Sequence, residues 1–191
     1  GKTTVATNLT VMRANAGRDV LLIDADDQET STDFTALRSE RRGEGAGYTG
    51  IKLTGPSVRT ETLKLKPKYQ DIVIDTGGRD TTSQRAALAV SDVLLIPFVP
   101  RSFDIWTIEK VAELVEEMKT ADAADVLRDS PTLQLLNVLI GERKAFGNAA
   151  AEGLSVVELR RQDPKALEEI SALYRLIFGE DYVHNNSGDT N

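Results

Sequence analysis

Four short apolar runs constrain the fold of this chain most strongly. They lie at residues 20–24, 72–75, 93–97 and 133–140, and each is rich in leucine or β-branched residues. Apolar residues do not alternate with polar ones in these runs, so both faces of each expected strand would be buried. That pattern is typical of strands in a parallel sheet.

Stretches with helical periodicity separate the expected strands and lie at residues 4–16, 83–89, 104–119 and 164–178. Gly17 follows the first stretch, where a C-cap glycine is expected. Residues 41–55 show no clear period and are predicted to form a loop. The alternation of strands and helices predicts an α/β fold with a doubly wound, mostly parallel sheet flanked by helices.

The expected domain occupies residues 1–184, and residues 185–191 are predicted to be a polar tail. The chain opens directly on Gly1, Lys2 and Thr3, without a preceding strand. We therefore expect the first strand of the sheet to be missing, because the sequence is a fragment or starts at the first ordered residue.

Composition excludes several classes of function. The 191 residues carry a net charge of −7, so contact with nucleic acid would need a local basic patch. The absence of cysteine excludes disulfides and thiolate metal sites, and the single histidine, His184, lies in the tail. No apolar run approaches the roughly 20 residues that span a bilayer, and no leader for export is visible, so we expect a cytoplasmic protein.

The first four residues, Gly1, Lys2, Thr3 and Thr4, resemble the end of a Walker A loop that leads into a helix. A helix N-terminus offers free N–H groups and a partial positive charge to phosphate oxygens. Lys2 adds a full charge, and the Thr3 hydroxyl is a hard ligand for Mg²⁺. Four residues alone are equally compatible with a loop capped by threonine.

Two carboxylates follow expected strands. Asp24 ends the first run, Asp75 ends the second, and Gly77 and Gly78 come next. Ligands of open parallel sheets bind beyond the carboxyl ends of the strands, so both acids are predicted to lie where phosphates and a metal would bind. A single aspartate at a strand end is commonly a helix N-cap, but two beside a Gly-Lys-Thr sequence favour a nucleotide site.

Together these motifs resemble the ParA/MinD superfamily of deviant Walker ATPases, and within it the plasmid-partition ParA proteins. The matching segments are residues 1–4, 24–28, 72–80, 92–97 with Pro100 and Asp104, and 143–156. The resemblance covers most of the chain and implies a fold of the P-loop NTPase type.

The resemblance implies an ATPase that forms a homodimer around two ATP molecules with Mg²⁺. Such dimers bind DNA nonspecifically and release it after a partner, a centromere-binding or adaptor protein, stimulates hydrolysis. A cytoplasmic, nucleoid-associated location follows from this description.

The family's functional positions map onto this sequence one by one. Lys2 would clamp phosphates, Thr3 would hold Mg²⁺, and Asp26 would position the attacking water. Asp24 and Asp75 would support the water shell of the metal. The other expected nucleotide contacts are Gly1, Thr4 and Gly78 at the phosphates and Pro97 and Pro100 near adenine, with residues 24–28 and 76–80 as the two switches.

The sequence departs from the family pattern in several places. Asp27 stands where proline is usual, and the family's signature lysine would lie upstream of residue 1. The asparagine that recognises adenine is absent after residues 133–140, where the family also has a loop, a helix and a strand. We therefore predict that Ile140 and Gly141 are not bonded neighbours in the native protein.

Basic residues that would face DNA are Arg143, Lys144, Arg160 and Arg161, although such residues are often only solvated surface. The apolar stripe of residues 170–178 is flanked by Glu168, Glu169, Glu180 and Asp181, which anionic lipid would repel. We predict that this helix packs on the sheet and that the protein has no membrane partner.

Two other functions compete with this interpretation. One is a P-loop enzyme that uses ATP for biosynthesis, and the other is a nucleotide-switched scaffold without DNA binding. DNA-stimulated ATP turnover would separate the partition ATPase from both, whereas a small-molecule product would favour the biosynthetic enzyme.

Overall fold

A parallel sheet lies at the centre of the protein. The computed structural model describes residues 1–78, 81–97 and 138–183, and within them the strand order is β2-β1-β3. The strands are β1 (Val20–Ala25), β2 (Thr49–Lys52) and β3 (Asp71–Thr76). In the register, Asp24 of β1 lies beside Asp75 of β3 and beside Lys52 of β2. The two aspartates therefore share one edge of the sheet, as the sequence predicted.

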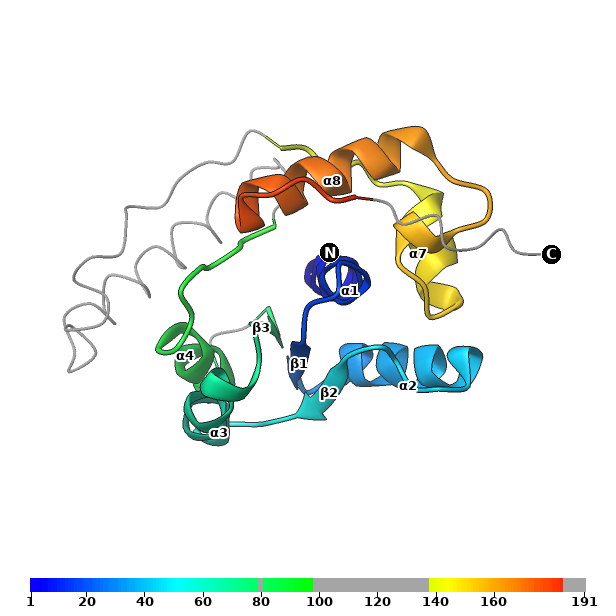
Figure 1. Ribbon diagram of the computed structural model, residues 1–191. Coiled ribbons are helices and arrows are strands. Elements are labelled where there is room, and N and C mark those ends of the chain that lie inside the picture. The colour runs from blue at the N-terminus through cyan, green and yellow to red at the C-terminus, as the bar shows by residue number, and fades with distance from the viewer. Residues whose placement is uncertain (79–80, 98–137, 184–191) are drawn as a thin grey trace.

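Helices cover both faces of this sheet, so the predicted α/β architecture is confirmed. Helix α1, with α7 and α8 beyond it, lies on one side, and α3 and α4 lie on the other (Figure 1). The helices are α1 (Lys2–Asn15), α2 (Thr30–Arg42), α3 (Ser57–Leu65), η1 (Lys66–Lys68), α4 (Thr82–Leu88), α7 (Lys144–Ala151), η2 (Val156–Glu158) and α8 (Pro164–Phe178).

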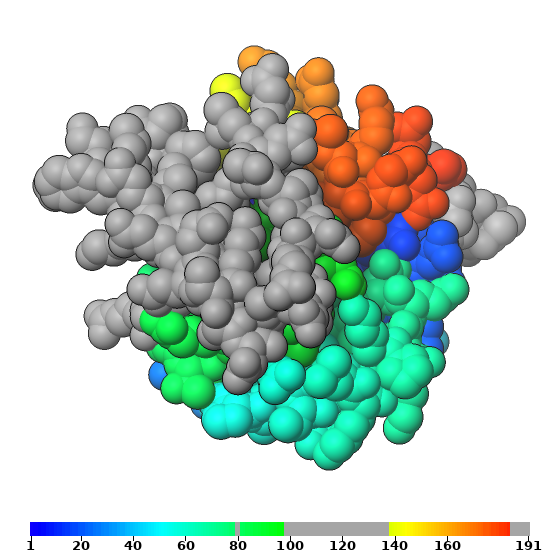
Figure 2. Space-filling view, turned by 90° about the vertical axis from the view of Figure 1, so that its left-hand side faces the viewer, coloured from blue at the N-terminus to red at the C-terminus, as the bar shows by residue number. Residues whose placement is uncertain are grey.

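The larger core lies between α1 and α8. Leu9 and Met12 of α1 pack with Ile170 and Leu173 of α8, which uses the apolar stripe of residues 170–178. Figure 2 shows α8, in orange and red, above the green segment that includes η1. Helix α8 therefore packs mainly on α1, which lies between it and the sheet, rather than on the sheet itself as predicted.

Helix α1 is buried almost all round, so its polar side chains need internal partners. The hydroxyls of Thr7 and Thr10 donate to carbonyl oxygens one turn earlier, each at 2.8 Å. Asn8 donates to the Thr4 carbonyl at 2.7 Å and accepts from the Ser155 hydroxyl at 2.8 Å. The loop before η2 is thereby fixed to the first half of α1.

Helix ends follow the sequence signals. Gly17, with φ of 80°, follows the C-cap of α1, as predicted. Thr81 caps α4, where its hydroxyl accepts from the Gln84 N–H at 3.1 Å, and Asp163 caps α8 before Pro164.

Several element predictions were wrong. Residues 41–55 contain β2 rather than only a loop, and residues 93–97 and 138–140 form no strand. β2 was missed because its four residues are mostly exposed and contain no apolar run. The apolar residues 93–97 and 138–140 form no strand because an apolar run becomes a strand only where a neighbouring strand supplies hydrogen bonds. The sequence also missed α2 and α3. Residues 104–119, 133–137 and the tail lie outside the described residues, and the break between Ile140 and Gly141 stays a prediction.

Candidate nucleotide-binding site

Helix α1 begins at the edge of the sheet where β1 and β3 end. Its N-cap is Gly1, which has no side chain to cap the first turn, and that turn contains no acidic residue. Free N–H groups and the positive end of a 14-residue helix therefore remain for a ligand. Lys2 reaches toward the loop after β3: a β-carbon added to Gly78 would lie 3.1 Å from its Nζ atom.

Asp75 is buried, with 3% of its surface exposed. Its Oδ2 atom accepts a hydrogen bond of 2.6 Å from the Ser31 hydroxyl, and the Thr3 side chain also bonds to this carboxylate. Burial raises the pKa of Asp75, and the neighbouring charges of Asp24 and Asp26 raise it further, against the effect of the two hydroxyls. A positive ligand here would relieve an unfavourable charge.

Asp24 is buried to a similar extent, with 2% exposed, and accepts three hydrogen bonds. The Asp26 N–H donates at 3.1 Å, and the N–H and hydroxyl of Thr32 donate at 2.8 Å each. Asp24 therefore caps the first turn of α2 from the neighbouring strand. The helix-cap interpretation and the ligand-site interpretation apply to the same carboxylate.

Asp26 belongs to the first expected switch and lies against the second. Its Oδ1 atom accepts from the Gln28 N–H at 3.2 Å, and a β-carbon added to Gly77 would lie 3.2 Å from the same atom. A side chain at position 77 would therefore be in tight contact with the Asp26 carboxylate. Asp26 is thereby held against the loop that follows β3.

Sequence reasoning missed three residues of this site. Ser31 and Thr32 bind the two buried carboxylates, and Lys52 lies in register with Asp24 and forms an ion pair with Glu29. The hydroxyls of Ser31 and Thr32 follow Gln28 by three and four residues in the sequence. This spacing becomes informative only once helix α2 is predicted, because both residues lie in its first turn. Nothing in the short run of β2 pointed to Lys52.

The donor set suits a magnesium nucleotide. Within the described residues no group of three or more acidic or histidine side chains forms a metal cage. Magnesium needs none, since it commonly takes one or two carboxylates together with phosphate oxygens and water. Two adjacent buried carboxylates, the Thr3 hydroxyl and the Lys2 ammonium provide that combination.

Comparison with known families agrees with this geometry. Residues 1–156 match the family model described as the CobQ/CobB/MinD/ParA nucleotide binding domain. The chain belongs to this family. The ParA/MinD resemblance seen in the sequence is thus confirmed.

Individual relatives support the same assignment. The maintenance of carboxysome distribution protein A of Halothiobacillus neapolitanus (strain ATCC 23641 / c2) is 26% identical over 195 residues, covering 91% of this chain and 88% of that protein. The structure of apo McdA of Cyanthece has a TM-score of 0.73 at 17% identity and covers 93% of this chain and 94% of its own. The cell division ATPase MinD of Pyrococcus furiosus has a TM-score of 0.71 at 19% identity, covering 94% and 93%. The two structures show that the fold is shared.

Most of the remaining predicted site residues lie within the described part of the chain. Pro97 is exposed, and Pro100 lies outside the described residues. Arg143 is engaged: its Nε atom donates to Glu169 of α8 at 3.0 Å. Arg160 and Arg161 are exposed, and in the described part of the chain neither forms an ion pair.

Lys144, the fourth basic residue of the predicted patch, is also exposed.

None of the helices in the described ranges has both the length and the apolar character that a membrane span requires.

Proposed function

We propose that this protein is a magnesium-dependent ATPase of the positioning type, which forms a homodimer on binding ATP. The observation that carries the proposal is the meeting of the Lys2 ammonium, the free start of α1 and the buried Asp24 and Asp75 at one sheet edge. Such an edge pairs a phosphate-binding end with carboxylates that need a cation.

Each residue has a distinct task in this proposal. Lys2 and the N–H groups of α1 bind the phosphates, with Gly1, Thr4 and Gly78 lining the same loop. Thr3, Asp24 and Asp75 hold Mg²⁺ directly or through water, and the bound ion would neutralise charge on the phosphates. Pro97 and Pro100 flank the base. Asp26 orients water from its position against Gly77.

The water-orienting role is tested with Asp26→Ala. We expect hydrolysis to fall about 100-fold, because general-base catalysis contributes at least that much, while ATP affinity stays within twofold of the parent protein. ATP binding is measured with a fluorescent analogue and turnover by phosphate release. Loss of ATP binding in this variant would instead assign Asp26 to the metal shell.

We further propose that the ATP-bound dimer binds DNA without sequence preference and moves or spaces a cargo. Two of the relatives are a carboxysome distribution protein and a cell division ATPase, which supports a positioning task. A partner protein would stimulate hydrolysis and release the DNA. Arg160, Arg161 and Lys144 are the favoured phosphate contacts, because they are exposed and unpaired in the described residues.

The DNA surface is tested with the double variant Arg160→Ala/Arg161→Ala. If both arginines of each protomer contact phosphates, the dimer loses four contacts. The slope of log affinity against log salt then becomes shallower by about 3.6, and DNA binding at moderate salt weakens. Arg143→Ala is the matched control, since Arg143 is already paired with Glu169. Equal DNA binding with ADP and ATP would contradict the nucleotide switch.

A further inference from the structure

Lys52 lies beside the segment that joins β1 to α2. It is the last residue of β2, lies in register with Asp24, and its ammonium forms an ion pair with the Glu29 carboxylate. Asp24 and Asp27 also act on this ammonium electrostatically. Lys52 is therefore a partly exposed cation that pairs with Glu29 and feels the charges of Asp24 and Asp27.

Glu29 has an unusual backbone. Its φ is 56°, and in the described ranges it is the only residue other than glycine with positive φ. L-residues rarely adopt this conformation, and they retain it only where the surroundings hold them there. An ion pair on the Glu29 side chain is such a restraint.

This strained residue connects Asp26 to α2. The Glu29 N–H donates to the Asp26 carbonyl at 3.2 Å, which closes a tight turn. The Glu29 carbonyl accepts from the Asp33 N–H at 2.9 Å in the first turn of α2. Rotation of Glu29 into an ordinary conformation would open this turn and move Asp26 away from Gly77.

We propose that Lys52 is a positioning residue of this ATPase, which holds Glu29 in the left-handed conformation and thereby keeps Asp26 against the second switch. The inference rests on the proposed function for its kinetic consequence, but its structural part stands apart from it. Lys52 touches no expected phosphate contact, so it acts on turnover through Asp26 rather than on ATP affinity.

The kinetic test compares Lys52→Met with the full-length parent protein. Methionine keeps an unbranched apolar stem and removes the charge. Because the ion pair is partly exposed, at 38% and 46%, we expect kcat to fall at most about fivefold through misplacement of Asp26. The dissociation constant for ATP should stay within twofold. Lys64→Met is the matched control, because Lys64 is an exposed lysine paired with Glu61 on α3 and should leave both values unchanged.

A rescue experiment separates positioning from general stability. Glycine adopts positive φ without a steric penalty, so a glycine at position 29 needs no restraint. Adding Glu29→Gly to Lys52→Met should return kcat to within about twofold of the parent value, although a second side chain has been removed. Thermal melting confirms that each variant is folded before its turnover is compared.

A measurement without nucleotide completes the test. Amide hydrogen exchange at Gln28 and Glu29, both bonded to Asp26, should accelerate in Lys52→Met and return to the parent rate in the double variant. Unchanged exchange in Lys52→Met, or a folded double variant that is not rescued, would overturn the inference. If the parent protein hydrolyses no ATP, the proposed function fails, and the exchange rates still decide whether Lys52 holds the turn.

Discussion

Asp75 and Glu158 are both mostly buried carboxylates, but their pKa values shift in opposite directions. Burial raises the pKa of Asp75, and the nearby charges of Asp24 and Asp26 act in the same direction. Burial also opposes ionisation of Glu158, but hydrogen bonds from Arg38 and Asn15 outweigh it and lower the pKa of Glu158. The difference lies in the partners, since Asp75 has hydroxyls and like charges whereas Glu158 has a guanidinium.

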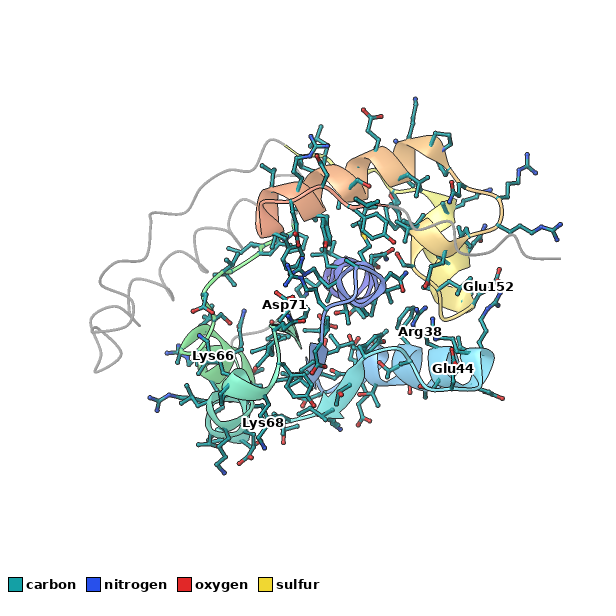
Figure 3. All side chains as sticks on the ribbon, viewed as in Figure 1. Arg38, Glu44, Lys66, Lys68, Asp71 and Glu152 are labelled. Carbon is teal, nitrogen blue, oxygen red and sulfur yellow. The ribbon has the colours of Figure 1, made fainter. Side chains whose placement is uncertain are left out.

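Arg38, the partner of Glu158, donates all its hydrogen bonds to acceptors within the protein. Arg38 is 1% exposed and binds both oxygens of Glu158, at 2.7 and 2.8 Å, together with the carbonyl oxygens of Ala46 and Gly153. It projects from α2 toward α7, as Figure 3 shows. Gly153 lets the backbone of α2 come close, because a β-carbon there would lie 2.7 Å from the backbone nitrogen of Arg38.

The comparison separates structural charges from charges that await a ligand. The pair of Arg38 and Glu158 joins α2 to η2, and its hydrogen bonds are satisfied within the protein. The pair of Asp24 and Asp75 has no ion pair with a cation in the described residues and lies at the edge where α1 begins. Two buried carboxylates that have hydrogen bonds but no opposite charge beside them are unfavourable, so we infer that the second pair serves ligand binding rather than stability.

The largest expected effect is on stability, from Arg38→Met. The change removes the opposite charge from Glu158 and the donor from the carbonyl oxygens of Ala46 and Gly153. Breaking a buried pair lowers the free energy of unfolding by about 3–5 kcal/mol. Urea denaturation at pH 7 measures it. Because the folded-state pKa of Glu158 lies below its unfolded value of about 4.3, the contribution is complete above that pH and disappears as the pH falls through the folded pKa.

The control for this change is Arg41→Met. Arg41 pairs with Glu152 at 2.8 Å, but both side chains are about half exposed, at 47% and 48%. Such exposed pairs contribute about 0–1 kcal/mol. A loss of similar size in the two variants would remove the distinction between the structural pair and surface charge.

The second effect is on ligand binding, from Lys2→Ala. Loss of a charge-assisted phosphate contact should weaken ATP binding by roughly 1.5–3 kcal/mol, or about 10- to 150-fold, with no comparable change in the free energy of unfolding. Isothermal titration with Mg²⁺-ATP measures the change. Lys68→Ala is the control, because η1 leads into the start of β3, whereas Asp75 lies at the end of that strand. Unchanged ATP affinity in Lys2→Ala would refute the phosphate assignment.

The smallest effect is expected from Asp75→Asn without nucleotide. The folded-state pKa of Asp75 is raised, so stability is highest below its unfolded pKa of about 3.9 and falls as the pH rises through the folded value. The variant should therefore melt at a higher temperature than the parent protein at pH 7, and the difference should vanish at pH 3. Magnesium-dependent stabilisation by ATP should decrease in the same variant. A lower melting temperature of the variant at pH 7 would show that the ionised Asp75 side chain does not destabilise the folded protein.

Sequence reasoning placed the two aspartates of the candidate site correctly because the signals are local. Lys2 and Thr3 precede a helix, and Asp24 and Asp75 end apolar runs, so the rule for parallel strands brings them to one edge. The register confirms that placement. The same reasoning failed for β2, whose four residues have little apolar content, and for residues 93–97, which form no strand despite their apolar run.

The sequence by itself determined the family, the fold class, the ends of α1 and α8, and the edge at which the two aspartates meet. Only the tertiary structure decided that Ser31 binds Asp75, that Lys52 holds Glu29, and that Arg38 binds Glu158. Strand ends and helix caps depend on neighbours within a few residues, which a sequence displays directly. Partner choice between distant residues depends on strand register and on the direction in which each helix packs, and these are fixed only when the whole chain is folded.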